Sequence, residues 1–181
     1  MIGFYRPTRI LDRLRLRILY RTAFPRSERK PFSIIRKMQR EGRSDVWCFR
    51  DGTTFLGLAT TINGDDKVLI DYFAVARRRR GRGHGGEMLR ALIEHYSPRG
   101  VFLEIEIPYP DAKNAEERRR RKSFYISAGM TPTETRFSLF GVDMELMCSG
   151  CELDFDEYRR FYLENYGKFA YDHIKPLPKS K

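Results

Sequence analysis

Long apolar runs are missing from this sequence of 181 residues. No stretch approaches the roughly 20 consecutive apolar residues that cross a bilayer. The first apolar segments are interrupted by four arginines, Arg13, Arg15, Arg17 and Arg21. We therefore expect neither a membrane anchor nor a secretory signal peptide, and no membrane partner.

Cysteine is scarce, since the chain contains only Cys48, Cys148 and Cys151. These are too few and too unevenly spaced for a disulfide framework. Cys148 and Cys151 form a C-x-x-C sequence, but no second Cys or His pair accompanies them, as a zinc site would require. We predict ordinary thiols, no metal site and a reducing compartment, the cytoplasm. The histidines also show neither metal-ligand spacing nor a Ser-His-acid triad; they are His84, His95 and His173.

Acidic residues are nearly absent from the first 40 positions. These hold 12 lysines and arginines against two acids, so 12 minus 2 gives +10 of the whole chain's net charge of +11. Such a basic segment indicates an anionic ligand, an acidic partner or a solvated helical surface.

The periodicity of apolar residues predicts a mixed α+β chain without internal repeats. Ile10, Leu14 and Ile18 recur every fourth position, which predicts an amphipathic helix whose arginines face outward. Hairpin-turn signals separate three β-rich runs and predict an antiparallel meander. The predicted elements are strand 2–6, helices 10–20 and 32–38, strands 46–49, 54–61 and 67–75, helix 83–96, strand 101–107, helix 114–129, strands 134–140 and 142–147, and a last helix opening at 154.

Two helix starts in the second half of the chain have the pattern of a capping box. Asn114 is followed three residues later by Glu117, and Asp154 is followed three residues later by Glu157. In a capping box the first side chain and the later carboxylate each accept a hydrogen bond from the other residue's backbone amide. The sequence therefore predicts a helix N-terminus at each place.

A glycine- and arginine-rich turn is the strongest chemical signal. The segment from Val75 to Gly86 reads V-A-R-R-R-R-G-R-G-H-G-G and lies between a predicted strand and a predicted helix. Glycines let the backbone approach an anion closely, and helix N-terminal amides stabilise negative charge. The arginines add charge-assisted contacts to phosphate oxygens. We predict a pyrophosphate site here, the alternative being a turn that the glycines merely shape.

A nicotinamide-dinucleotide site fits this segment less well. The glycines also match G-x-G-x-x-G, and Glu104 follows roughly 20 residues later. However, the dinucleotide turn needs its first glycine directly at the strand end, whereas four arginines intervene here. The preceding strands are hairpin-linked, and too little chain remains for the parallel units of a doubly wound fold.

Two segments resemble motifs of the GNAT acetyltransferase superfamily. The strand L-I-D-Y-F-A-V ending at Val75, followed by R-G-R-G-H-G from Arg80, is similar to the family's strand plus R/Q-x-x-G-x-G/A motif. Phe124-Tyr125-x-x-x-Gly129 resembles its second motif, and the order of elements is also similar. The likeness is good over roughly residues 46–130 and poor after them.

The resemblance implies a fold, a cosubstrate and a set of binding residues. The length predicts one domain over 1–181, with a C-terminal helix and tail at 150–181. The resemblance implies a mixed, mostly antiparallel central sheet flanked by helices, with the acetyl-CoA-binding core over roughly 46–130. Acetyl-CoA is the implied cosubstrate. In many members an asparagine lies seven residues before the tyrosine, where this chain has Arg118. The backbones of Phe73 and Val75 would bind the pantetheine and the acetyl carbonyl, and the pyrophosphate would lie on Arg80, Gly81, Arg82, Gly83, His84 and Gly85.

Direct acetyl transfer to an amine needs a base for the amine and an acid for the departing thiolate. Asp71 is the preferred base, because a carboxylate is unusual in a strand that looks buried on both faces; a turn or an arginine could equally satisfy it. Glu104 and Glu106, on one face of their strand, could share that role or form a solvated or arginine-paired face. The resemblance implies Tyr125 as the acid; otherwise it is a core aromatic residue.

A small nucleic-acid- or ribosome-binding module without catalysis is the alternative function. Its phosphate contacts would be the two basic runs, 77–82 and 118–122. For the enzyme, we expect acetyl-CoA and an amine acceptor as partners, and a monomer or homodimer. The acceptor remains open among a protein N-terminus, a lysine, a polyamine, an aminoglycoside and a small metabolite.

Overall fold

The computed structural model describes residues 2–177 of the chain. The chain forms two compact units, which are described separately. Unit 1 comprises residues 2–63 and 69–92, and unit 2 comprises 64–68 and 93–177 of the described residues. The tail predicted at the C-terminus lies partly outside the described residues, at 178–181. Within residues 2–177, no helix combines the length and the apolar composition needed to cross a membrane.

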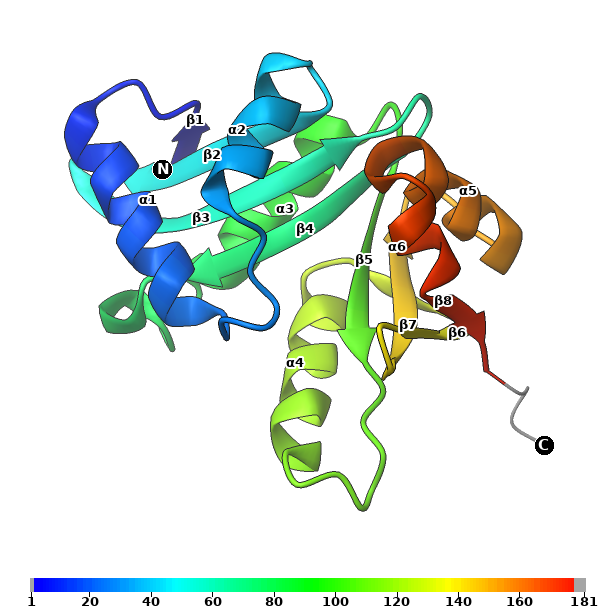
Figure 1. Ribbon diagram of the computed structural model, residues 1–181. Helices are drawn as coiled ribbons and strands as arrows, with labels where there is room; N and C mark the ends of the chain where they lie inside the picture. Colours follow the sequence, from blue (N-terminus) through cyan, green and yellow to red (C-terminus); the bar gives the residue numbers. More distant parts are fainter. Residues whose placement is uncertain (1, 178–181) are drawn as a thin grey trace. The chain divides into compact units, whose positions relative to one another are not determined.

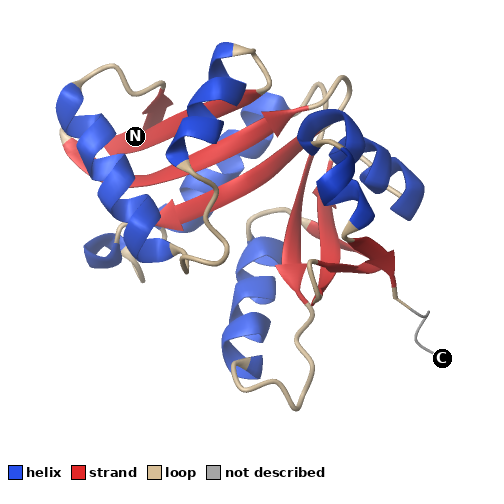
Figure 2. Cartoon of the chain, in the orientation of Figure 1, coloured by secondary structure: helices blue, strands red, loops and turns tan. Residues whose placement is uncertain are grey.

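Unit 1 has a strand order of β1-β2-β3-β4. β1 pairs antiparallel with β2, and β2 with β3, with a bulge between Phe49 and Arg50. In Figures 1 and 2, α1 and α2 lie on one face of these strands and α3 lies on the other. The elements are β1 (Ile2–Tyr5), α1 (Ile10–Ala23), α2 (Phe32–Arg40), β2 (Ser44–Asp51), β3 (Thr54–Asn63), β4 (Val68–Val75), the 3₁₀ turn η1 (Arg77–Arg79) and α3 (His84–Tyr96).

Close packing between α3 and the strands explains the glycine in the middle of β3. A Cβ atom on Gly57 would lie 2.3 Å from the carbonyl oxygen of Ala74 and 2.6 Å from the terminal methyl of Met88. Neither distance is possible, so only glycine lets β4 and α3 approach β3 this closely. This packing fixes the end of β4 and the start of α3, between which the basic turn lies.

The apolar face predicted for the first helix is exposed. Ile10, Leu14 and Ile18 are 82%, 52% and 54% exposed, whereas Leu16 and Leu19 are buried. The prediction that the helix is amphipathic holds, but the stripe that suggested it faces outward. The buried face also contains Asp12, which is fully buried. Because a carboxylate occupies that position, the pattern of apolar residues does not identify this face of the helix as the buried one.

Asp12 is buried because two partners from neighbouring strands satisfy it. It forms an ion pair with Arg50 of β2, and the hydroxyl of Tyr5 donates a hydrogen bond to it at 3.2 Å. A buried charge is tolerated when it is paired and hydrogen-bonded. The pair therefore attaches the start of α1 to β1 and β2.

Unit 2 has the order β5-β7-β6-β8, and the β5–β7, β6–β7 and β6–β8 pairs are antiparallel. α5 packs on one face, where Phe161 contacts Phe102 of β5 with ring centroids 4.9 Å apart. α4 covers the opposite face, where Lys122 pairs with Glu145 of β7. The elements are β5 (Val101–Glu106), α4 (Ala115–Ser127), β6 (Thr131–Leu139), β7 (Val142–Ser149), α5 (Phe155–Tyr166), α6 (Lys168–Asp172) and β8 (Ile174–Pro176).

The predicted fold class is confirmed. The chain is α+β, and helices cover the strands of each unit (Figure 1). The antiparallel pairs are β1–β2, β2–β3, β5–β7, β6–β7 and β6–β8. The predicted elements are all found, with ends that differ by a few residues. Three short elements, η1, α6 and β8, were not predicted, because none is long enough to show a period.

The two predicted capping boxes have different outcomes. Asp154 accepts a hydrogen bond from the backbone of Glu157 at 2.8 Å, and the Glu157 carboxylate accepts one from the backbone of Asp154 at 3.1 Å. Asn114 precedes α4, but its side chain makes no capping hydrogen bond. The Glu117 carboxylate instead pairs with Arg121, one helical turn further on, at 3.1 Å. The capping-box prediction for Asn114 is therefore wrong.

Candidate active site

The basic turn of unit 1 leaves β4, passes through η1 and enters α3. Gly81 and Gly83 have φ angles of 72° and 81°, in the left-handed region that disfavours other residues. An added Cβ on either glycine would meet no atom within 4 Å. Both glycines are therefore required by the backbone conformation and not by lack of space. The turn remains open on the outside, as an anion-binding turn must be.

The first turn of α3 presents unused hydrogen-bond donors. The amide of Glu87 donates to the carbonyl of Gly83 at 3.3 Å. Within residues 2–177, the preceding amides of His84, Gly85 and Gly86 have no acceptor, as expected at a helix N-terminus. The Nδ1 atom of His84 is buried and also has no partner among the described residues. These donors and the helix dipole fit a phosphate group.

Arginine side chains surround this helix N-terminus. Arg80 and Arg82 are exposed, and the Nε of Arg80 donates to the carbonyl of Val75 at 3.0 Å. This hydrogen bond holds Arg80 against the end of β4 and leaves its two terminal nitrogens for a ligand. Phe73 is half-buried on β4, with its ring 6.4 Å from that of Phe49. The predicted binding residues thus form a contiguous stretch of unit 1, from Phe73 on β4 to the first turn of α3.

Asp71, the preferred base, is held by a lysine that the sequence analysis did not single out. The Nζ of Lys30 lies 2.6 Å from the Oδ1 of Asp71, whose side chain is 10% exposed. The backbone amide of Lys30 donates to the hydroxyl of Tyr72 at 3.1 Å, and its carbonyl accepts from the hydroxyl of Tyr20 at 3.0 Å. Burial and the nearby Asp71 carboxylate raise the pKa of Tyr72. The loop between α1 and α2 is therefore fastened to β4 beside Asp71.

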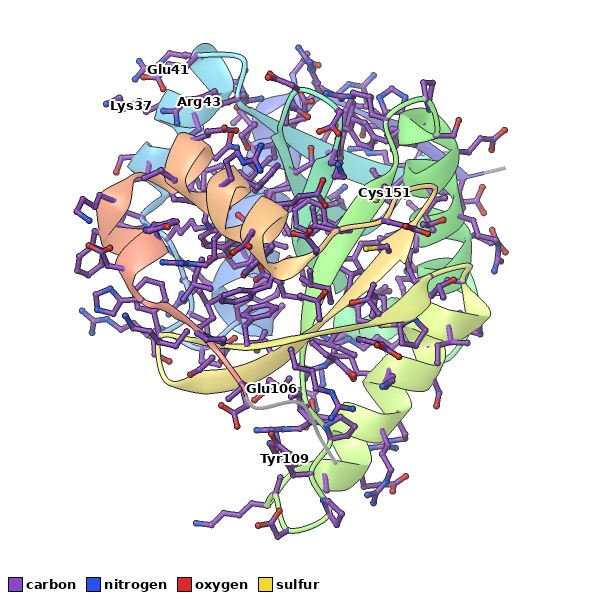
Figure 3. All side chains as sticks on the ribbon, turned by 90° about the vertical axis from the view of Figure 1, so that its right-hand side faces the viewer. Lys37, Glu41, Arg43, Glu106, Tyr109 and Cys151 are labelled. Atoms are coloured by element: carbon purple, nitrogen blue, oxygen red, sulfur yellow. The ribbon has the colours of Figure 1, made fainter. Side chains whose placement is uncertain are left out.

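Two carboxylates on β5 of unit 2 have different partners. Glu104 accepts hydrogen bonds from the hydroxyls of Tyr158 and Tyr162 at 2.8 and 2.6 Å. Glu106, labelled in Figure 3, pairs with Arg118 at 2.7 Å and with Arg121 at 3.3 Å. The arginine-paired alternative is thus correct for Glu106. Glu104 is instead oriented by the aromatic helix α5.

Arg118 stands where many family members have asparagine. Besides pairing with Glu106, it donates from Nη1 to the carbonyl of Ile107 at 2.9 Å. Both interactions hold the end of β5 against α4. In this chain the position therefore connects two elements of unit 2.

Tyr125 lies on α4 and is half-buried, with its ring 5.2 Å from that of Phe124. Burial raises the pKa of its hydroxyl above the ordinary value of 10, and the charge of Arg121 opposes the increase. The hydroxyl has no hydrogen-bond partner within residues 2–177. A phenol that stays protonated at neutral pH and has no internal acceptor is suited to donate a proton.

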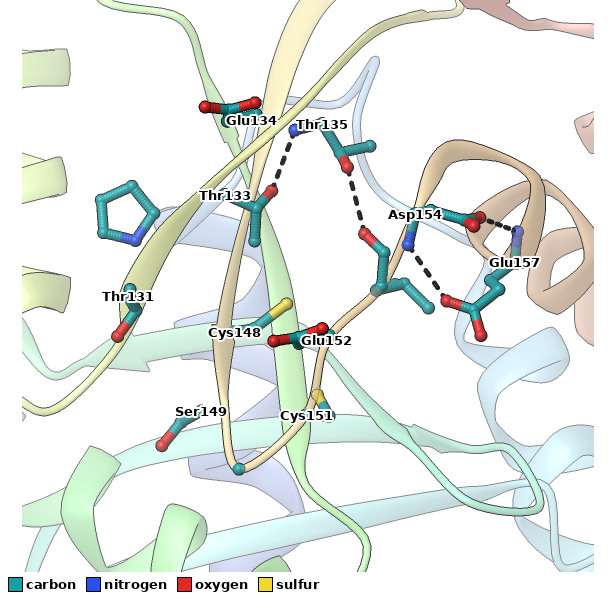
Figure 4. Close-up of a pocket in the computed structure, with 13 residues that line it drawn as sticks. Thr131, Thr133, Glu134, Thr135, Cys148, Ser149, Cys151, Glu152, Asp154 and Glu157 are labelled. Carbon is teal, nitrogen blue, oxygen red and sulfur yellow. Dashed lines mark hydrogen bonds between the residues drawn. The ribbon is translucent and has the colours of Figure 1, made fainter.

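A cavity of about 810 Å³ in unit 2 contains none of the predicted site residues. Figure 4 shows its wall, formed by β6, β7 and the segment before α5, including Cys148 and Cys151. A hydrogen bond from Cys148 and the charge of Lys67 lower the pKa of Cys151. All three cysteines are free, as predicted. Among residues 2–177, no group of three or more His, Cys, Asp or Glu side chains is placed to hold a metal ion.

Comparison with known proteins gives the family. A sequence model described as the Acetyltransferase (GNAT) family matches residues 13–118 of this chain. This range includes the basic turn and ends before Tyr125. A comparison with curated protein sequences gave no significant match.

Solved structures show the same fold. A protein assigned to the GNAT acetyltransferase family from Bacteroides thetaiotaomicron superposes with a TM-score of 0.75 at 23% identity, covering 93% of this chain and 99% of its own. A Bacillus subtilis acetyltransferase in complex with CoA gives 0.60 at 15% identity, covering 83% and 98%. The ribosomal-protein-S18-alanine N-acetyltransferase of Escherichia coli gives 0.59 at 18% identity, covering 82% and 93%.

Family membership and fold together define the class of the protein as an acyltransferase. The family match spans more than half of the sequence, and it includes β4, the basic turn and α3 of unit 1. The chain therefore belongs to the GNAT family of N-acetyltransferases.

Proposed function

We propose that this protein transfers the acetyl group of acetyl-CoA directly to a primary amine. The observation that supports this most is the start of α3, where the unpaired amides of His84, Gly85 and Gly86 adjoin the exposed Arg80 and Arg82. Such a corner suits a diphosphate. The backbones of Phe73 and Val75, immediately upstream on β4, would then receive the pantetheine and the acetyl carbonyl.

Acetyl-CoA, when bound, supplies the thioester that reacts. The amine nitrogen forms a bond to the thioester carbonyl carbon, the carbon–sulfur bond breaks, and the departing sulfur takes up a proton. We assign that proton to the hydroxyl of Tyr125. An alkyl ammonium with a pKa of about 10.4 must lose a proton before or during attack. We assign this step to Asp71, with Glu104 as the other candidate base.

The chain as a whole, residues 1–181, would act as one acetyltransferase domain. Its three free cysteines fit a reducing compartment, and we place the enzyme in the cytoplasm. The E. coli protein of similar fold is named for the alanine of a ribosomal protein. A protein N-terminus is therefore one acceptor to be tested, beside small amines.

A non-catalytic nucleic-acid-binding module is disfavoured by family membership and by the charges on α4. In the basic run of that helix, Arg118, Arg119, Arg121 and Lys122 each pair with a carboxylate of unit 2. Cations that are already paired bind nucleic-acid phosphates weakly, because the phosphate must first displace the carboxylate of the protein.

The proposal is tested by binding and turnover with Arg80→Ala and a matched control, Arg36→Ala. Arg36 is exposed on α2, outside the basic turn. Acetyl-CoA at 100 times its Kd should stabilise the wild type by about 2.7 kcal/mol. The thermal shift should be retained in Arg36→Ala and strongly reduced in Arg80→Ala. Thiol release from acetyl-CoA in the presence of an amine library should likewise be retained in Arg36→Ala and strongly reduced in Arg80→Ala. An unshifted wild type that releases no thiol would refute the proposal.

A further inference from the structure

A second cationic site lies in unit 1, between the end of α1 and the start of α2. It is a cavity of about 530 Å³. Its wall contains Tyr20 and Phe32 but no carboxylate. The cationic side chains that line it are Arg17, Arg21, Arg26, Arg29 and Lys30.

The arginines of this cavity lack the internal carboxylate partners that other cations of the chain have. Within residues 2–177, none of the four forms an ion pair with an Asp or Glu, unlike the paired run on α4. The Nε of Arg29 is buried and has no hydrogen-bond partner there. Arg17 lies over the ring of Phe32, at 5.5 Å from its centroid. Cations that are close together and unpaired repel one another, and an anion removes that cost.

Lys30 connects the cavity to Asp71. Lys30 lines the cavity, and its ammonium lies 2.6 Å from the carboxylate of Asp71. The side chain of Lys30 therefore lies between the cavity and the base assigned above. The cavity is separate in sequence from the turn at 80–85, which is the site assigned to the diphosphate of acetyl-CoA.

We propose that this cavity binds the anionic part of the acceptor, so that the substrate is a primary amine that also carries phosphate or carboxylate groups. This inference rests on the proposed acetyl transfer. The guanidinium group of an arginine can bind two oxygens of a phosphate or carboxylate through two parallel hydrogen bonds. Several arginines together suit a group with more than one negative charge. A polyamine or an aminoglycoside is positively charged, so the cationic side chains of the cavity wall would repel it.

Matched pairs of amines test the charge of the acceptor. O-phosphoethanolamine is compared with ethanolamine, and L-aspartate with L-asparagine, in the thiol-release assay. We expect kcat/KM to be about ten-fold or more higher for at least one member with the additional anionic group than for its counterpart without that group, and spermidine to be a poor substrate. Each charge-assisted hydrogen bond contributes about a ten-fold change in binding.

Variants test the position of the anion. Arg29→Gln should raise the KM for the anionic amine about ten-fold and leave the KM for acetyl-CoA unchanged. Arg15→Gln, an exposed position of α1 outside the cavity wall, is the matched control and should change neither. Arg26→Gln, also exposed, replaces Arg29→Gln if that variant does not fold.

Binding without turnover gives an independent result. With CoA added first to fill the diphosphate site, O-phosphoethanolamine or L-aspartate should still raise the melting temperature of the wild type and Arg15→Gln, but not of Arg29→Gln. Equal use of both members of each amine pair, an equal shift in Arg29→Gln, or no shift from either anion would overturn the inference while leaving acetyl transfer intact. Failure of acetyl-CoA itself to bind would instead refute the proposed function.

Discussion

The phenol of Tyr125 differs from the other tyrosine hydroxyls of unit 2 that adjoin charged groups. Tyr158 and Tyr162 both donate to Glu104, so their protons are already used inside the protein. Tyr125 has no such acceptor within the described residues, and burial raises its pKa. Among these three phenols, its proton is therefore the one available to a departing thiolate.

Replacing Tyr125 by phenylalanine should lower kcat roughly ten-fold or more, the usual contribution of a positioned acid. Stability should hardly change, because no internal hydrogen bond is lost. The measurement is turnover with the true acceptor beside a urea unfolding curve. Since the pKa of Tyr125 is raised above 10, the group stays protonated and wild-type kcat should show no loss from its ionisation below pH 10. Unchanged turnover in the variant would remove Tyr125 from the mechanism.

At the scale of a helix, α1 shows how a buried charge can mislead a hydrophobicity pattern. The residues that pack inward include Asp12 and Leu16, one turn apart, and the carboxylate is paired with Arg50. Apolar spacing favours the opposite stripe through Leu14. The partner of Asp12 is 38 positions away in the sequence, so nothing local reveals that this carboxylate is buried.

Two leucines of α1 test which face packs. Leu16→Ala should lower the free energy of unfolding by about 2–5 kcal/mol, because it leaves a cavity in the core. Leu14→Ala should change it by less than about 0.5 kcal/mol, because that side chain is 52% exposed. Urea denaturation of both variants measures the difference. A loss at Leu14 as large as at Leu16 would mean that the predicted stripe is the buried one.

The elements were predictable where their signals are local. Strand alternation, turn glycines and the Asp154 capping box each lie within a few residues of the structure they specify. At Asn114 the side chain makes no capping hydrogen bond, and the Glu117 carboxylate pairs with Arg121 one helical turn later. β8 was not predicted, because three residues are too few to show the alternation of buried and exposed side chains that marks a strand; only Ile174 is buried.

At the scale of the whole molecule, the candidate site also contains some residues that local sequence signals predicted and others that they did not. The basic turn could be predicted because its residues are consecutive in the sequence, from Arg80 to Gly85. Lys30 could not be, because it meets Asp71 from 41 positions away. The only sequence signal for it is the excess of positive charge in the first 40 residues, which does not indicate a particular side chain. Local chemistry is thus visible in the sequence, whereas charge pairing requires the fold.

The uneven distribution of the net charge of +11 predicts how the enzyme should respond to salt. Acetyl-CoA is an anion, and exposed arginines such as Arg80 and Arg82 attract it through solvent. Salt shortens the range of that attraction, from about 10 Å at 0.1 M to about 3 Å at 1 M. The KM for acetyl-CoA should therefore rise several-fold between about 0.05 and 0.5 M NaCl, while kcat at saturation stays nearly constant. Arg80→Ala should weaken this salt dependence, and Arg36→Ala should leave it nearly as steep as in the wild type. A KM that does not change with salt would show that the arginines of the turn contribute no charge attraction to acetyl-CoA.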